Sequence, residues 1–140
     1  MVEQFGLGAY CSTTPKPEGL WITEPLGYLD LLHLNMHAAM VITDSGGLQE
    51  ETTVLGVPCI TLRHNTERPI TCEVGTNFMV GNNRDDILRQ AFKVLRGEVP
   101  RGRVPQKWDG RAAERIVDIL AHLDETVTAD REPSIRAAVQ

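Results

Sequence analysis

Residues 41–51 read V-I-T-D-S-G-G-L-Q-E-E, and this stretch decides how the rest of the chain is interpreted. The apolar run at residues 40–43 favours a short strand buried on both faces. Small residues at 44–47 then predict a turn, and residues 46–55 predict a helix. A strand, turn and helix in this order direct free backbone N–H groups, and the positive end of the helix dipole, at one point. The stretch therefore predicts an anion-binding corner in an α/β protein.

This corner suits a phosphate group in particular. Gly46 and Gly47 carry no side chain that would keep an anion away. Glu51, about one helical turn later, is placed to accept hydrogen bonds from hydroxyls such as those of a ribose. The same residues also have a purely structural interpretation, in which Ser45 caps the helix and the glycines form a tight turn. The local pattern leaves both interpretations open.

Strands and helices alternate along most of the chain. Strands are predicted at 20–23, 40–43, 59–62 and 77–80, and helices at 27–39, 46–55, 69–74, 84–95 and 110–123, with Asn83 as the cap of the helix that follows it. Short connections between them predict a parallel sheet with helices on both faces. We expect one domain over 1–123 that begins partway through its sheet, then a flexible or partly helical tail over 124–140.

Composition excludes several classes of protein. The chain has 140 residues, of which 41% are hydrophobic and 24% charged, as in an ordinary globular domain. The net charge of −5, with 14 basic residues that form no dense block, argues against nucleic-acid binding. The sequence shows no apolar run of bilayer-spanning length and no signal peptide. Cys11, Cys59 and Cys72 lack metal or redox spacing, which predicts reduced thiols in a cytoplasmic protein.

Several ordered motifs resemble the UDP-N-acetylglucosamine 2-epimerase family. They are D-S-G-G-L-Q-E-E at 44–51, L-G-V-P at 55–58 and R-H-N-T-E-R-P at 63–69. G-T-N at 75–77 and E-P-L-G-Y at 24–28 fit the same pattern. Motifs in a fixed order are more specific than a single glycine turn. The resemblance extends over residues 5–123, which correspond to the carboxyl-terminal part of a full family member.

The resemblance implies a fold and an activity. The fold would be a Rossmann-like three-layer parallel sheet, the UDP-binding C-terminal domain of a two-domain GT-B architecture, truncated at its N-terminal side. Family members interconvert UDP-N-acetylglucosamine and UDP-N-acetylmannosamine by eliminating and re-adding UDP, with no nicotinamide or metal cofactor. The acids and bases of that reaction come mainly from the amino-terminal domain. We therefore expect this chain to hold the UDP-sugar, to contain no catalytic residue and to be inactive alone.

The resemblance also assigns binding residues. The diphosphate would lie against Ser45, Gly46 and Gly47, the ribose against Glu51, and the uracil against the backbone of Tyr28. From their place near the carboxyl ends of parallel strands, either Arg63 or Arg68 could also pair with a phosphate, and Arg68 is the candidate. Three of these assignments have an alternative. Glu51 suits the helix dipole without any ligand, Tyr28 suits a half-buried aromatic position, and Arg68 suits an ion pair with the neighbouring Glu67.

His33 and His37 are four residues apart on a predicted helix, a spacing that can bind zinc. No third ligand is evident in the sequence. We therefore expect neither a metal nor another cofactor.

The resemblance leaves partners and rival functions to consider. The faces that would normally meet the missing domain are expected to be exposed and apolar. We therefore expect the chain to form a homodimer or to contact an N-terminal domain. We do not expect it to bind nucleic acid or membranes. Two other functions remain open: a GT-B glycosyltransferase domain, and a non-catalytic nucleotide-binding or assembly module.

Overall fold

The structure is a computed structural model that describes residues 19–123. It divides the chain into two units, Met1–Leu34 and Asn35–Gln140, and each unit is described by itself. The predicted tail at 124–140 lies outside the described residues.

The described part of the first unit consists of an irregular segment followed by a helix. Residues 19–27 form no regular structure, and α2 (Tyr28–His37) then begins and continues into the second unit. Trp21 is 87% exposed. The predicted strand at 20–23 is therefore wrong for this structure. A strand needs a neighbour to take its backbone hydrogen bonds, and the described part of this unit contains none.

The second unit contains a parallel sheet. Its three strands lie in the order β1-β2-β3, and they are β1 (Val41–Thr43), β2 (Cys59–Thr61) and β3 (Asn77–Met79). Three of the predicted strands are thus confirmed, each one residue shorter than expected. Thr43 is in register with Thr61, and Thr61 with Met79. Because the strands are parallel and end in register, the loops that follow them meet at one edge of the sheet.

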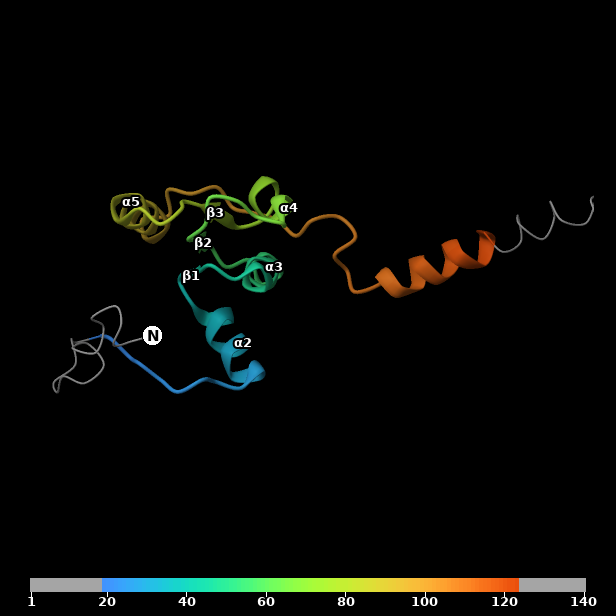
Figure 1. The fold of residues 1–140 in the computed structure, drawn as a ribbon, viewed down its shortest axis with the longest axis horizontal. Coiled ribbons are helices and arrows are strands. Elements are labelled where there is room, and N and C mark those ends of the chain that lie inside the picture. The colour runs from blue at the N-terminus through green and yellow to red at the C-terminus, as the bar shows by residue number, and fades with distance from the viewer. Residues whose placement is uncertain (1–18, 124–140) are drawn as a thin grey trace, which may run out of the picture. The chain divides into compact units, whose positions relative to one another are not determined.

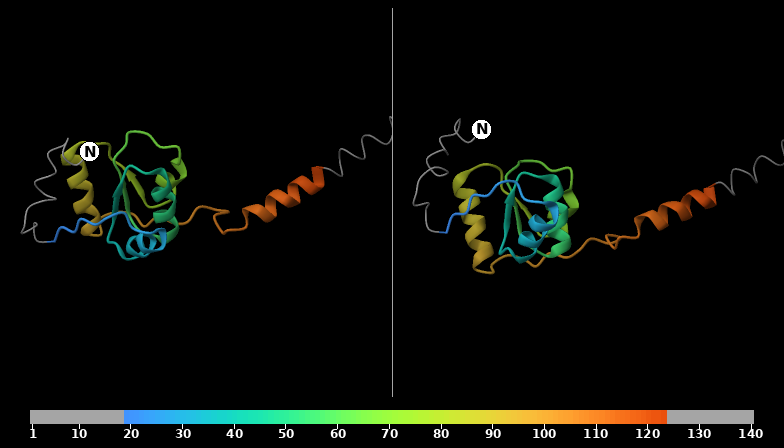
Figure 2. Two further views of the ribbon diagram at one scale, coloured as in Figure 1. Left: turned by 60° about the horizontal axis from the view of Figure 1, so that its bottom comes forward. Right: turned by 90° about the horizontal axis from the view of Figure 1, so that it is seen from below.

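Helices cover both faces of this sheet, as the sequence predicts. Figures 1 and 2 show α3 (Gly46–Leu55) and α4 (Pro69–Glu73) on one face and α5 (Arg84–Leu95) on the other. Both α3 and α5 begin and end at the predicted residues, and a further helix covers 112–123. The central strand β2 is buried along its whole length. The unit therefore has the three layers of a partial Rossmann-like domain.

Polar side chains make up much of the buried interior. The buried apolar residues among those described are Val57, Cys59, Ile60, Val94 and Pro105. Buried polar residues of the second unit are more numerous: Asn35, Gln49, Thr52, Thr53, Thr61, Thr71, Thr76 and Asn77. The Thr52 and Thr53 hydroxyls donate to the carbonyls of Leu48 and Gln49, at 2.7 and 2.8 Å. These bonds within α3 offset the cost of burying hydroxyl groups between the helix and the sheet.

Gly75, the first residue of G-T-N, marks a close approach between α3 and α4. A Cβ atom at this position would lie 2.6 Å from the Thr53 hydroxyl and 2.6 Å from the Thr71 carbonyl oxygen. Any side chain here would push the two helices apart. The glycine is therefore required by packing.

The two described cysteines are free thiols. Cys59 is buried and Cys72 is half-buried, and burial raises the pKa of both thiols.

Between residues 19 and 123, no helix is long and apolar enough to cross a membrane.

The cap of α5 gives a prediction about stability. The Asn83 side chain accepts hydrogen bonds from the backbone N–H groups of Asp85 and Asp86, at 2.9 and 3.2 Å. Asn83→Ala should lower the free energy of unfolding by about 1 kcal/mol, because both donors lose their acceptor. Urea unfolding followed by circular dichroism measures this change.

Ser45 provides the matched control, because it occupies the equivalent position before α3 but its side chain makes no cap hydrogen bond. Ser45→Ala should change the free energy of unfolding by less than about 0.5 kcal/mol. Equal losses in the two variants would contradict this assignment of the caps.

Candidate functional site

The turn after β1 leaves the start of α3 uncapped by a side chain. Ser45 has extended backbone angles, φ −77° and ψ 128°, and its N–H donates to the Thr43 hydroxyl at 3.0 Å. The Ser45 hydroxyl itself makes no cap bond. The first N–H groups of a helix have no partner within the helix. At α3 the Ser45 side chain gives them no cap, so these N–H groups can donate to an acceptor from outside the chain.

Gly46 and Gly47 border open space, in contrast to Gly75. A Cβ atom on Gly46 would meet no atom within 4 Å, and one on Gly47 would meet the Ser45 Oγ at 3.9 Å. Neither glycine is among those with a positive φ angle. Packing and backbone conformation therefore do not require glycine at either position. The open space beside the two glycines leaves room for an anion at the start of α3.

Arg68 brings a positive charge close to this corner. Its Nε lies 2.7 Å from Oε1 of Glu50, on α3. Glu50 is four residues after Gly46, so the two share one face of the helix. The sequence analysis considered an internal ion pair between Arg68 and Glu67. The internal ion pair is present, but its acid is Glu50. Glu67 pairs with Arg63 at 3.1 Å and offers Arg68 only its backbone carbonyl oxygen, 3.3 Å from Nη1.

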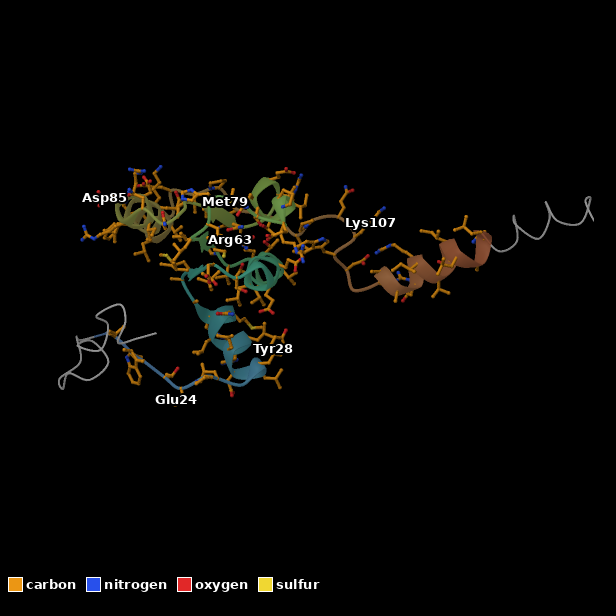
Figure 3. The ribbon with its side chains drawn as sticks, in the orientation of Figure 1. Glu24, Tyr28, Arg63, Met79, Asp85 and Lys107 are labelled. Atoms are coloured by element: carbon orange, nitrogen blue, oxygen red, sulfur yellow. The ribbon has the colours of Figure 1, made fainter. Side chains whose placement is uncertain are left out.

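The ion pair between Arg63 and Glu67 lies within the loop that follows β2. Arg63, which is labelled in Figure 3, is the second residue after that strand. A backbone hydrogen bond within Glu67 and the Arg63 guanidinium hold the pKa of the Glu67 carboxyl below its ordinary value. The pair joins residues four apart and helps to shape the loop that presents Arg68.

Glu51 differs from its neighbour Glu50. It is half-buried, and among residues 19–123 it forms no hydrogen bond or ion pair. It stands four residues after Gly47 and so shares a helix face with it. Its carboxylate oxygens are thus available to accept from ligand hydroxyls beside the anion corner. Glu51 is the sixth residue of α3, and the first turn of this helix contains no acidic residue. The alternative role of an acid stabilised by the helix dipole is therefore wrong for this structure, because that effect is confined to the first turn.

Tyr28 belongs to the first unit, so the structure does not place it relative to the corner. It is the first residue of α2 and is 62% exposed (Figure 3). The half-buried position considered in the sequence analysis is therefore wrong for this structure.

Sequence reasoning missed a group of buried polar side chains beneath the site. The Thr66 hydroxyl donates to Oε1 of Gln49 at 2.7 Å, and Nδ2 of Asn77 lies 3.2 Å from the same oxygen. Gln49 is fully buried and Asn77 is 3% exposed. The available signal was an amide in each of two motifs, Gln49 in Q-E-E and Asn77 in G-T-N.

The structure places His33 and His37 on α2. Within residues 19–123, no three His, Cys, Asp or Glu side chains come together in a way that could hold a metal ion. The described residues thus offer no donor set for a metal.

Comparison with known proteins identifies relatives of the chain. Residues 9–121 match the family model of UDP-N-acetylglucosamine 2-epimerase. The UDP-N-acetylglucosamine 2-epimerase of Methanocaldococcus jannaschii is 46% identical over 101 residues, which are 72% of this chain and 27% of that protein.

Solved structures agree with this match. The chain is similar to the M. jannaschii UDP-GlcNAc 2-epimerase in complex with UDP-GlcNAc and UDP, with 40% identity, a TM-score of 0.69, and coverage of 86% of this chain and 32% of the other. A S. aureus MnaA structure with UDP is 28% identical, with a TM-score of 0.69 and coverage of 91% and 34%. The chain thus spans about a third or less of the length of the relatives it matches.

Proposed function

Because the chain belongs to the UDP-N-acetylglucosamine 2-epimerase family, we propose that it is the UDP-sugar-binding part of such an enzyme. The whole enzyme would interconvert UDP-N-acetylglucosamine and UDP-N-acetylmannosamine by eliminating UDP and adding it back. This chain would hold UDP during the step in which it is detached from the sugar.

The open corner at the start of α3 carries the proposal. The diphosphate would accept hydrogen bonds from the first-turn N–H groups and from the Ser45 hydroxyl, in the space beside Gly46 and Gly47. Arg68, held one helical turn away by Glu50, would supply positive charge to the same oxygens. A leaving UDP gains negative charge on its phosphate, so these donors stabilise the products of elimination.

Glu51 would hold the ribose. A carboxylate accepts hydrogen bonds from two adjacent hydroxyls, and Glu51 has no competing partner among the described residues. Neighbouring Glu50 is already paired with Arg68. We further propose that the uracil meets the backbone at Tyr28.

The acids and bases of epimerisation are proposed to lie outside this chain. The described residues contribute anion-binding and hydroxyl-binding groups, which orient the ligand and retain UDP rather than move a proton at the sugar. Free thiols at Cys59 and Cys72 agree with the proposed cytoplasmic location.

Exposed apolar side chains suggest where a partner would pack. Phe92 and Leu95 on α5 are 53% and 60% exposed, and Val117 in the helix over 112–123 is 63% exposed. We propose that such faces meet a second copy of the chain or an N-terminal domain.

Light scattering should report a dimer of the isolated chain. A monomer at all concentrations would refute the proposal that a second copy is the partner.

Calorimetric titration with UDP tests the binding proposal. Wild-type chain should bind, and Glu51→Ala should weaken binding by about 1–3 kcal/mol, roughly 5- to 150-fold, because the ribose hydroxyls lose their acceptor. Gly46→Ala should also weaken binding while the chain stays folded, since the new methyl group meets only the ligand.

The matched control is Glu73→Ala, which removes an exposed carboxylate from α4 and should leave the affinity for UDP unchanged. A folded wild-type chain that does not bind UDP would refute the proposed function. A non-catalytic nucleotide-binding module would bind UDP as well. It would differ in one respect: adding an N-terminal domain would produce no turnover of UDP-N-acetylglucosamine.

The isolated chain should not interconvert the two UDP-sugars, because the proton-transferring groups are proposed to lie elsewhere. The measurement is incubation of purified chain with UDP-N-acetylglucosamine, with products separated by chromatography. Formation of UDP-N-acetylmannosamine above the level of a protein-free control would overturn this expectation. Transfer of the sugar to an added acceptor would instead indicate a glycosyltransferase.

A further inference from the structure

We propose that the buried amides of Gln49 and Asn77 are positioning residues for Arg68. They act through the hydroxyls of Thr66 and Thr71, which hold the two backbone groups of Arg68. This inference rests on the proposed function, because it explains how the arginine comes to stand beside the diphosphate corner.

The N–H side of Arg68 is held through Thr66. The Arg68 N–H donates to the Thr66 hydroxyl oxygen at 2.9 Å. That hydroxyl in turn donates its own proton to Oε1 of Gln49 at 2.7 Å. One hydroxyl thus serves as acceptor and donor at once, and it ties the backbone of Arg68 to the buried face of α3.

The carbonyl side of Arg68 is held through Thr71. The Thr71 hydroxyl donates to the Arg68 carbonyl oxygen at 2.7 Å, and Nδ2 of Asn77 donates to the Thr71 hydroxyl at 3.1 Å. Asn77 is itself fixed, because its Oδ1 accepts from the Thr61 hydroxyl of β2 at 2.6 Å. This second chain of bonds ties Arg68 to the sheet.

The two chains of bonds meet in the interior. Nδ2 of Asn77 lies 3.2 Å from Oε1 of Gln49, the oxygen that also accepts from Thr66. Gln49, Thr61 and Thr71 are fully buried, so water does not compete for the bonds that Asn77 makes with them. The bond from the Arg68 N–H to Thr66, in contrast, is exposed. The Arg68 side chain is also 48% exposed. A rigid buried layer therefore supports a cation that remains accessible to a ligand.

The side chain at position 49 must accept two hydrogen bonds without carrying a charge, and the amide of Gln49 meets both conditions. Oε1 of Gln49 accepts two hydrogen bonds, while its Nε2 is buried with no partner. A carboxylate would accept the same two bonds without leaving a donor unsatisfied. It would also bury a negative charge beneath a site that binds an anion, at a larger cost.

The consequence for ligand binding is a difference between the two halves of UDP. The diphosphate would meet a cation whose backbone is fixed at both sides and whose side chain is held by Glu50. A preorganised group loses little freedom on binding and so contributes more affinity. The ribose of the uridine half would depend on Glu51, which is not part of these chains of bonds.

The test compares Thr66→Val with Thr66→Ser. Valine keeps the shape of threonine but removes the hydroxyl, whereas serine keeps the hydroxyl and loses a methyl group. Affinity for UDP, from calorimetry, should fall about tenfold in Thr66→Val and return toward the wild-type value in Thr66→Ser. Affinity for uridine, from chemical-shift titration, should be the same in all three chains. Equal effects on UDP and uridine, or no effect of valine, would overturn the proposal.

A second measurement decides the inference without any ligand. Nitrogen-15 NMR reports hydrogen exchange at the Arg68 Nε–H, which the ion pair with Glu50 protects. Exchange should be faster in Thr66→Val than in wild type or Thr66→Ser, and unchanged exchange would refute the positioning role. If the wild-type chain does not bind UDP but exchange is still faster in Thr66→Val, the proposed function is refuted and the positioning role of the buried amides stands.

Discussion

Hydrogen bonding within the polar layer between α3 and the sheet constrains the rest of this domain. A buried hydroxyl or amide is costly unless it finds a partner. Thr52 and Thr53 find theirs within α3, and Gln49 finds its partners in Thr66 and Asn77. Such bonds are directional, so α3 fits against β2 and α4 in one rotational setting. That setting decides which side chains α3 buries and which it presents to a ligand.

The orientation of α3 divides three consecutive side chains among three roles. Gln49 is buried and supports the loop after β2, Glu50 pairs with Arg68, and Glu51 has no partner among the described residues. Successive residues of a helix point in different directions, so neighbouring positions face different surroundings. The motif Q-E-E thus combines a structural amide, a carboxylate that orients a cation and a carboxylate available for hydroxyls.

Three glycines around α3 serve two different purposes, which the structure separates. Gly75 is required because α3 and α4 approach each other closely. Gly46 and Gly47 border open space at the start of α3 and are not needed for packing. A glycine that packing does not require, at a helix start that no side chain caps, is a useful indication of a site reserved for a ligand.

The sequence by itself determined the local elements and the family. Apolar periodicity and cap residues predicted the bounds of α3 and α5, and the run V-I-T-D-S-G-G predicted a strand, a turn and an open helix start, because these signals act between near neighbours. The strand predicted at 20–23 failed, since a strand also needs a partner that local residues do not supply. Tertiary structure alone decided that Arg68 pairs with Glu50 rather than Glu67, and that Gln49 joins Thr66 and Asn77, which are 17 and 28 residues away. Such pairings follow from how parallel strands bring distant loops to one edge of a sheet, and no local pattern records that geometry.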